Sequence, residues 1–414
     1  MNQSSSGALG VYISIPFCRS KCTYCNFASG VYPASEHARY VERVIEDLRQ
    51  AAEQAESRGA HLPHRVDSIY LGGGTPSLLA PELVTSLFGA IRQSLDVETD
   101  AEVTVECAPA QLSDQTLAAM VASGVNRVSL GAQSFAEAEV RSSGRLHVPE
   151  DVTRDLARLR AAGIDNLNVD LIAGLAGQTR ASWSESLAAL VDTGTPHASV
   201  YMLEVDEDSR LGRELLAGGS RYRAGLVPRD EVIAEMYEQA CEQLAAAGLA
   251  QYEISNFARP GAESRHNLRY WQRRPYLGLG VDASSMLHGR SETGALPPVL
   301  RLTTGDNLQQ YLAGPVKSEA SWLDAQAQHE EAWFLGLRCN QGVAFDELET
   351  EFGPALVAPA RAVAARLVED GLLAGNETRV WLTPRGRLLA NDVFAEFLEL
   401  APACALPARA ATRR

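Results

Sequence analysis

Three cysteines near the start of the chain have the types and spacing to hold a metal cluster. Cys18, Cys22 and Cys25 form a C-x3-C-x2-C loop directly after an apolar run, residues 11–15, that predicts a buried strand. The eight residues of this loop suffice to curl around a compact cluster, since each residue spans up to about 3.5 Å. A cubane of four irons needs four ligands. Three thiolates therefore predict a [4Fe-4S] cluster with one iron open to another ligand.

Two alternatives exist for this loop. A structural zinc site needs a fourth ligand at matching spacing. The candidates are distant, because His37 stands twelve residues beyond Cys25 and Cys107 lies on another predicted strand. Buried, inert cysteines are the second alternative. Arg19 and Lys21 lie between the first two thiols and favour the thiolate forms that bind iron, so the cluster is the favoured interpretation.

The composition excludes several classes of protein and partner. The chain has 414 residues, of which 46% are hydrophobic and 21% charged, as in a soluble globular protein. Its 37 basic and 52 acidic residues give a net charge of −15, which disfavours nucleic acid as a partner. No apolar run of about 18 residues predicts a membrane span, and the start lacks a signal-peptide pattern. We therefore expect a cytoplasmic protein with reduced cysteines.

The elements that position this loop follow from the pattern of apolar residues. Six apolar runs read as buried strands: Val11–Ile15, Ser68–Leu71, Glu102–Glu106, Arg127–Gly131, Asn166–Leu171 and Ala198–Met202. Between them, five stretches show helical spacing: Glu36–Glu56, Pro81–Ser94, Ser113–Ser123, Pro149–Ala162 and Arg180–Val191. Such alternation indicates βαβ units and a parallel sheet. Six units predict an α/β fold with an incomplete (βα)6 TIM-like barrel, and a doubly wound open sheet is the alternative.

The pattern changes after Met202. A long helix near residues 229–247 is followed by a polar and aromatic segment, Tyr252–Ser285. The remainder predicts an α+β module of helices around a short hairpin, similar to a winged helix: helices 323–336, 345–352, 359–370 and 384–398, and hairpin 372–382. This stretch has no lysine and many acidic residues, so a packing or docking role is favoured over DNA reading.

Further motifs follow the cysteine loop in a fixed order. They are Tyr12–Phe17, Gly72–Pro76, Glu106, Arg127–Phe135, Gly144–Arg145 and Asn168–Leu175. Together with the cysteines they resemble the radical S-adenosylmethionine (SAM) superfamily. Within it, the chain is similar to the branch that contains oxygen-independent coproporphyrinogen III dehydrogenase and the heme chaperone HemW. The resemblance covers nearly the whole chain.

Pattern and resemblance together divide the chain into five parts. These are a flexible N-terminus (1–10), a radical SAM (βα)6 partial barrel (11–205), a barrel extension and linker with a heme- or substrate-binding segment (206–315), a winged-helix-like domain (316–400) and a disordered tail (401–414). Within the third part, residues 290–315 are rich in Gly, Thr and Pro and read as the linker.

The resemblance implies how SAM is held. Its amino and carboxylate groups would chelate the open iron. The dehydrogenase binds two SAM molecules, and matching positions here assign Tyr12, Gly73 and Glu106 to the first and Tyr24, Gly74, Thr75, Gln133, Arg145 and Asp170 to the second. Taken alone, the glycines are equally typical of a tight turn. The two acids are typical of helix caps, and the other polar residues are typical of an exposed surface.

Two features favour the chaperone side of this branch. The dehydrogenase has a further Cys two positions after the third, whereas Phe27 stands there, as in HemW-type chains. The segment His266–Trp271 resembles one that is associated with heme binding in HemW. This implies His266 as an iron ligand, with Tyr270 and Trp271 against the ring. Four arginines would clamp the propionates: Arg265, Arg269, Arg273 and Arg274. A hydrogen-bonded structural histidine and binding of single-stranded nucleic acid are the alternatives.

The resemblance implies a heme chaperone that binds a [4Fe-4S] cluster, SAM and one heme. It would hand heme to an acceptor such as a respiratory cytochrome or oxidase, with flavodoxin or ferredoxin as electron donor, and no catalytic residue is assigned. The alternative is an oxygen-independent coproporphyrinogen III oxidase, in which a SAM-derived radical starts the decarboxylation of propionates. A third class is another radical SAM activity on an unrelated substrate. One departure concerns residues 280–284, which lack a histidine that the family carries there.

Overall fold

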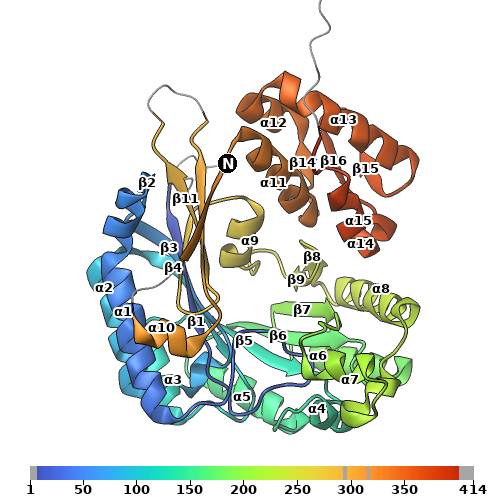
Figure 1. Cartoon of the computed structure of the whole chain (residues 1–414). Coiled ribbons are helices and arrows are strands. Elements are labelled where there is room, and N and C mark those ends of the chain that lie inside the picture. Colours follow the sequence, from blue (N-terminus) through green and yellow to red (C-terminus); the bar gives the residue numbers. More distant parts are fainter. Residues whose placement is uncertain (1–6, 292–295, 315–317, 401–414) are drawn as a thin grey trace, which may run out of the picture. The chain divides into compact units, whose positions relative to one another are not determined.

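Six parallel strands line up in the order in which they occur in the chain (Figure 1). In the computed structural model, which describes residues 7–291, 296–314 and 318–400, they are β1 (Leu9–Ile15), β3 (Arg65–Gly73), β4 (Asp96–Cys107), β5 (Arg127–Gln133), β6 (Asn166–Ala173) and β7 (His197–Met202). Each pairs in parallel with the next. The predicted α/β fold with a six-stranded partial barrel is confirmed. Since β1 starts at Leu9, it extends into the segment predicted as flexible (1–10).

Helices connect these strands and cover their outer side (Figure 1). They are α1 (Ala34–Ser57), α2 (Pro81–Ser94), α3 (Asp114–Ala122), α5 (Pro149–Ala161) and α6 (Arg180–Asp192), with the short η2 (Pro76–Leu78) and α4 (Glu137–Ser142). Local signals explain the starts: the Ser113 hydroxyl accepts from the Thr116 N–H at α3, and Pro149 opens α5. Apolar strand residues such as Ile69 and Val105 are buried, which holds the helices against the sheet.

Beyond β7, further elements extend the same sheet. They are α7 (Arg210–Leu216), η3 (Arg221–Leu226), α8 (Asp230–Ala246), β8 (Ala250–Gln251), β9 (Asn256–Ala258), α9 (Arg265–Trp271), β10 (Tyr276–Leu279), β11 (Ser284–Gly289), β12 (Val299–Thr304), α10 (Leu308–Ala313) and β13 (Ser318–Leu323), with β2 (Ala60–His61) beside β11. β9 pairs antiparallel with β7, and β10 pairs in parallel with β1. Across the described residues the sheet runs from β13 at one edge to β8 at the other, without closing.

The structure corrects the linker that the sequence predicted over residues 290–315. β12 and α10 lie in this stretch, and β12 pairs antiparallel with β11, so that Leu300 lies opposite Leu287 with both side chains buried. The Gly, Thr and Pro content indicates a linker, but strand formation depends on packing against a partner strand that composition does not reveal. Residues 299–322 accordingly belong to the first structural unit, and the C-terminal part of the second unit begins at Leu323 rather than at the predicted residue 316.

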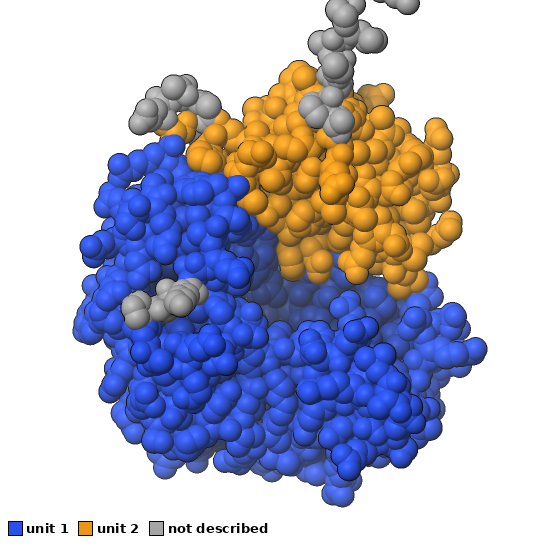
Figure 2. Space-filling model, viewed as in Figure 1, with its two compact units in different colours: residues 1–270, 274–290, 299–322 blue, residues 271–273, 291–298, 323–414 orange. Residues whose placement is uncertain are grey.

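The chain divides into two units, which Figure 2 colours separately. The first unit comprises residues 1–270, 274–290 and 299–322, and the second comprises residues 271–273, 291–298 and 323–414. The predicted tail, 401–414, lies outside the described residues. No helix in the described ranges is long and apolar enough to cross a membrane.

The second unit combines helices with a small antiparallel sheet. Its elements are α11 (Ala325–Arg338), β14 (Val343–Ala344), α12 (Phe345–Phe352), α13 (Pro354–Glu369), β15 (Leu373–Gly375), β16 (Arg379–Leu382), α14 (Pro384–Leu388) and α15 (Ala390–Ala395). The strands lie in the order β14-β16-β15. In the core of this unit, the Trp333 and Phe397 rings stack with their centroids 4.5 Å apart. The arrangement agrees with the predicted winged-helix-like α+β module.

The inner side of the parallel strands is polar. On β5, Arg127 and Ser129 line the barrel interior and alternate with the buried apolar residues Val128 and Leu130. The inward positions of the neighbouring strands are occupied by Tyr70, Glu106, Asn168, Asp170, Ser199 and Tyr201. Buried polar groups require hydrogen-bond partners. The apolar core therefore lies between strands and helices, while the interior of the barrel provides polar groups for binding.

Candidate functional site

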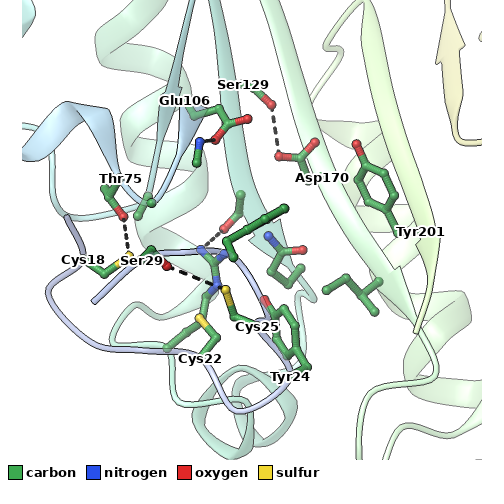
Figure 3. Close-up of a pocket in the computed structure, with 18 of the residues that line it drawn as sticks. Cys18, Cys22, Tyr24, Cys25, Ser29, Thr75, Glu106, Ser129, Asp170 and Tyr201 are labelled. Carbon is green, nitrogen blue, oxygen red and sulfur yellow. Dashed lines mark hydrogen bonds between the residues drawn. The ribbon is translucent and has the colours of Figure 1, made fainter. Parts of the chain in front are cut away.

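A pocket of about 510 Å³ opens from the cysteine loop into the barrel of the first unit. Figure 3 shows the three cysteines on one loop, beside Glu106, Ser129 and Asp170 on the strands. The predicted cluster and SAM residues that line this pocket are Cys18, Cys22, Cys25, Tyr24, Gly73, Gly74, Thr75, Glu106, Gln133, Arg145 and Asp170. The structure thus brings together residues from a long stretch of sequence. Tyr12, His266, Tyr270 and Trp271 do not line it.

Hydrogen bonds within the cysteine loop hold its shape. The Cys18 N–H donates to the Gly30 carbonyl at 2.8 Å, which joins the two ends of the loop. The Lys21 ammonium donates to the carbonyls of Phe27 and Ser29, at 2.6 and 2.9 Å. Lys21 therefore organises the loop backbone, in addition to placing a positive charge near the thiols as the sequence predicts.

Other hydrogen bonds fasten the loop to the segment that follows α4. The Ser20 hydroxyl donates to the Gly144 carbonyl and the Thr23 N–H donates to the Ser143 carbonyl, both at 2.9 Å. Gly144 has a φ of +82°, a conformation that glycine adopts without strain. The next residue is Arg145. The Gly144–Arg145 motif thus anchors the loop and delivers a guanidinium to the pocket.

The three thiols face one another around the mouth of the pocket. All are free, and all are partly buried. The Thr75 hydroxyl donates to the Cys18 sulfur at 3.9 Å, and the Ser29 hydroxyl lies 3.9 Å from the Cys25 sulfur. Burial raises the pKa of the Cys18 thiol, while hydrogen bonds from Ser29 and Thr75 act in the opposite direction. Thiols placed around one opening suit a cluster in which each thiolate binds a different iron.

No three His, Cys, Asp or Glu side chains among the described residues are grouped as a site for a single metal ion.

The glycine motif closes against the strand that precedes the cysteines. The Gly74 N–H donates to the Ile15 carbonyl at 2.8 Å, and the Thr75 N–H donates to the Phe17 carbonyl at 2.7 Å. A Cβ atom on Gly74 would lie 2.7 Å from the Phe17 oxygen, so a side chain there would force the backbones apart. Gly73 has a φ of +102°, which favours glycine. The motif is therefore required by the fold as well as by any ligand that approaches its backbone.

Glu106 is a half-buried acid whose pKa is raised close to neutrality by the pocket. Its carboxylate accepts from the Tyr70 hydroxyl at 2.8 Å and from the Gly73 N–H at 3.1 Å. Burial raises the pKa of Glu106 to about 7, and the charge of Asp170 adds to this effect. The two hydrogen bonds and the charge of Arg145 oppose it. A group with this pKa changes its charge within the physiological range.

Arg145 and Gln133 lie at the end of β5. The Arg145 guanidinium donates to the Gly131 carbonyl at 2.6 Å. Its charge opposes the effect of burial on the pKa of Tyr24, which burial raises. Gln133 is buried with a φ of +70°, a strained conformation for a residue with a side chain, of the kind that concentrates at functional sites. Both side chains line the pocket, and neither belongs to the exposed surface.

Asp170 belongs to a hydrogen-bond network across three strands. Its carboxylate accepts from the Ser129 hydroxyl at 3.0 Å and from the Asn168 amide at 2.7 Å. The same amide nitrogen lies 3.0 Å from the Ser199 hydroxyl. The His197 ring nitrogen Nδ1 lies 2.6 Å from the Asn168 oxygen. Asp170 is therefore held in place as a carboxylate acceptor, and it is not a helix cap.

His266 lies in the interior of the first unit. Its Nδ1 is 3.0 Å from the Ser68 hydroxyl and its Nε2 is 2.9 Å from the Tyr270 hydroxyl. The ring stacks on Tyr70, and Tyr12 packs nearby. Burial lowers the pKa of His266 to about 3, so the ring is neutral. Ligation of iron by His266 requires the ring to leave both of these partners.

The four arginines predicted to clamp propionates have other partners. Arg269 pairs with Asp67 in the interior, and Arg274 pairs with the same carboxylate at 2.8 Å. Arg265 donates to the Asp100 carbonyl. In the second unit, Arg273 pairs with Glu351, while Trp271 packs beneath the Arg338 guanidinium at 4.3 Å. The structure corrects the predicted clamp: Arg269, Arg273 and Arg274 pair with carboxylates of the protein, and the exposed Arg265 bonds to a backbone carbonyl. A buried arginine such as Arg269 needs such a partner.

Several pocket residues were not singled out by the sequence. They are Ser29, Tyr70, Arg127, Asn168, Ser199 and Tyr201. The available signal is the alternation of polar with apolar residues within strands that must be buried on both faces. Fully buried parallel strands are usually continuous apolar runs, so polar residues at every second position indicate a polar barrel interior.

Comparison with known proteins places the chain in a family. Residues 12–190 match the radical SAM superfamily, and residues 323–389 match the HemN C-terminal domain. The heme chaperone HemW of Lactococcus lactis is 34% identical over 392 residues, which cover 94% of this chain and 96% of that protein. The heme chaperone HemW of Bacillus subtilis is 34% identical over 391 residues, covering 94% and 98%. The chain belongs to the HemW family of radical SAM proteins.

A solved structure agrees with the fold. Coproporphyrinogen III oxidase (HemN) from Escherichia coli, a radical SAM enzyme, matches with a TM-score of 0.78 and 22% identity over 94% of this chain and 90% of that chain. The family resemblance drawn from the motifs is confirmed. Membership of the radical SAM family implies a [4Fe-4S] cluster and SAM. The three free thiols and the pocket beside them fit both groups.

Substitution of any one loop cysteine by alanine is expected to abolish cluster assembly, because two thiolates leave two irons without a protein ligand. For Cys18→Ala, Cys22→Ala and Cys25→Ala, anaerobic reconstitution should give well below half of the wild-type iron and acid-labile sulfide. The broad visible absorbance should also be lost. Cys241→Ala, at a partly buried cysteine outside the pocket, is the control and should retain the cluster. Normal iron content in all three loop variants would refute the cluster assignment.

The affinity for SAM is expected to rise with pH around neutrality. The Glu106 carboxyl is mostly protonated below pH 7 and mostly ionised above it. If Glu106 contacts SAM as the family resemblance implies, only the ionised form would attract the sulfonium cation. Affinity should therefore increase roughly five- to tenfold between pH 6 and pH 8. Equilibrium dialysis of labelled SAM against reconstituted protein measures this. Glu106→Gln should flatten the profile, whereas Glu98→Gln, at an acid paired with the exposed Arg65, should not. An equally steep profile in Glu106→Gln would rule out this role.

Proposed function

We propose that this protein is a heme chaperone, which binds a [4Fe-4S] cluster, SAM and one heme and transfers the heme to an acceptor protein. The observation that carries the proposal is similarity over 94% of the chain to proteins named heme chaperone HemW. Phe27 adds support, since it occupies the position at which the dehydrogenase has a further cysteine. Its side chain is 59% exposed at the mouth of the pocket, where a flat apolar ligand would cover it.

The proposed partners follow from this function. The acceptor is a respiratory cytochrome or oxidase, and flavodoxin or ferredoxin supplies electrons to the cluster. The proposed location is the cytoplasm, where reduced thiols remain available for iron. His266, Tyr270 and Trp271 are the proposed heme-binding residues, with His266 as the iron ligand once its ring leaves Ser68 and Tyr270.

An oxygen-independent coproporphyrinogen III oxidase is the second candidate. The fold of HemN and the match to the HemN C-terminal domain favour it. Both candidates require the same cluster and SAM site, so the pocket residues do not separate them. They differ in what happens to the tetrapyrrole, because a chaperone binds and releases heme unchanged while the oxidase converts coproporphyrinogen III.

Anaerobic titration with heme, followed by a turnover assay, separates the two candidates. The reconstituted protein should bind one heme per chain, reported by a Soret band that saturates at equimolar heme. It should produce no protoporphyrinogen IX from coproporphyrinogen III in the presence of SAM and reductant. Coproporphyrinogen oxidase from another source serves as the positive control for the assay. Sustained decarboxylation without stoichiometric heme uptake would establish the oxidase instead.

Replacement of His266 tests the proposed iron ligand. His266→Ala should shift the Soret band and weaken heme binding by about tenfold or more, because an axial imidazole is lost. Ser68→Ala removes a hydrogen-bond partner of the ring but leaves the imidazole, so its Soret band should match that of the wild type. His61→Ala, at an exposed histidine of β2, controls for nonspecific effects. An unchanged band and affinity in His266→Ala would remove the assignment.

A further inference from the structure

Arg127 is a buried guanidinium that forms no ion pair with another described residue. The residue is 2% exposed and lines the inner end of the pocket. Its Nε atom has no hydrogen-bond partner, and no ion pair joins Arg127 to a carboxylate among the residues that the structure describes. Burial of a charge costs a large free energy unless the charge is paired. The pocket wall therefore contains a cation that no carboxylate of the described residues pairs with.

Two other arginines of the first unit, one buried and one partly buried, have acceptors. Arg269 is 1% exposed and forms an ion pair with Asp67. Arg145 donates to the Gly131 carbonyl at 2.6 Å. The fold thus supplies acceptors to the guanidiniums that its packing requires. Arg127 differs from Arg269 because it has no anionic partner within the described residues. Arg145 also lines the pocket and has an Nε atom without a partner, but it donates to a backbone carbonyl, whereas the Arg127 side chain makes no hydrogen bond to another described residue.

A second polar group without a partner lies beside Arg127. Thr104 is completely buried, and its hydroxyl makes no hydrogen bond within the described residues. In the strand register, Thr104 on β4 lies opposite Arg127 on β5 and Tyr70 on β3. Directly paired residues present their side chains on the same face, and Tyr70 and Arg127 both line the pocket. Thr104 does not itself line the pocket, so the strand pairing places an unpartnered hydroxyl next to Arg127 but not on the pocket wall.

The acids on the inner strand faces are engaged elsewhere. Glu102 accepts from the backbone N–H groups of Arg265 and His266 at the start of α9, each at 3.0 Å. Glu106 accepts from Tyr70 and Gly73, and Asp170 accepts from Ser129 and Asn168. These contacts leave the carboxylates committed to hydrogen bonds other than those that Arg127 requires.

The imidazoles near Arg127 are not counterions either. Burial lowers the pKa of His266 to about 3 and that of His197 well below its usual value, and the charge of Arg127 contributes to both shifts. Both rings are therefore neutral. The hydroxyl of Tyr252, which also faces this region, is bonded to His197 at 2.9 Å. The two imidazoles and this hydroxyl therefore supply no negative charge to Arg127, and the buried Glu253 carboxylate, whose charge also acts on Tyr252, accepts from the Ser255 N–H and the Asn256 amide.

We infer that Arg127 binds a carboxylate that enters the pocket, and that this carboxylate is a propionate of heme. The inference rests on the proposed function for the source of the carboxylate. Planar guanidinium groups bind carboxylates through paired hydrogen bonds. Arg127 lies four residues before Gly131 on β5, about 13 Å along the strand. It is therefore nearer the amino-terminal ends of the strands than the residues expected to hold SAM. Because Arg127 already faces the pocket, this contact requires no movement of His266.

The test compares heme with heme dimethyl ester, in which both propionates are esterified. Arg127→Met is expected to weaken heme binding tenfold or more and to leave the binding of the diester unchanged. Arg127→Lys, which keeps the charge but not the planar fork, should lie between wild type and Arg127→Met. Arg141→Met, at an arginine whose side chain is 71% exposed on α4, is the matched control and should bind heme as the wild type does.

Thermal unfolding of the cluster-loaded protein gives a second readout that a purely structural arginine would not produce. Removal of an uncompensated buried charge should leave the melting temperature of heme-free Arg127→Met equal to or above that of the wild type. Heme should raise the melting temperature of the wild type more than that of the variant. A lower melting temperature of the heme-free variant, with equal losses for heme and its diester, would show that Arg127 only supports the fold.

The other possible results show whether the propionate assignment or the proposed function has failed. Unchanged heme affinity in Arg127→Met overturns the inference while the proposed function stands. A loss of affinity for SAM but not for decarboxylated SAM, with heme unaffected, would assign Arg127 to the SAM carboxylate and overturn the propionate assignment. Stabilisation of the wild type by acetate alone, without an effect on heme, would identify a site for small anions only. Absence of heme binding by the wild type would overturn the proposed function, and the propionate assignment with it.

Discussion

The backbone contact between the end of β3 and the exit of β1 is the constraint on which the site depends. Two hydrogen bonds join Gly74 and Thr75 to Ile15 and Phe17, at 2.8 and 2.7 Å. A Cβ atom on Gly74 would collide with both carbonyl oxygens. Because of this close approach, the cysteine loop begins directly over the strand ends. The thiols, the Gly73 backbone and Glu106 then face the same pocket.

The polar interior of the barrel sets a second constraint. Placing acids, amides and hydroxyls inside a parallel barrel is unfavourable unless each finds a partner. The Asp170, Asn168 and Ser199 network meets this condition across β6 and β7. Glu106 also has hydrogen-bond partners, but burial raises its pKa to about 7. Its carboxyl group is therefore only partly ionised at neutral pH. The interior is thus stable as a binding surface, and its electrostatics change most where a cationic ligand is expected.

The sequence was sufficient for the features that depend on local spacing. The C-x3-C-x2-C loop and the period of the six strands are encoded within short segments, and the family motifs added the residues that line the pocket. What it did not predict depends on pairing between distant segments. Strand β12 forms because β11 lies beside it, and His266 is buried because Ser68 and Tyr70 surround it. Neither neighbour is visible in the local pattern.

The arginines show how a residue type alone misleads. The basic residues around His266 suggested a propionate clamp, yet Arg269 and Arg274 share Asp67 and help to hold α9 against the start of the barrel strands. An arginine in a buried ion pair with additional hydrogen bonds stabilises the fold and has little freedom to bind a ligand. Arg127 stands in an ordinary strand motif, but it lacks such a partner in the described structure. Natural proteins keep locally unfavourable groups mainly at functional sites, so the unpaired guanidinium is the stronger indication of binding.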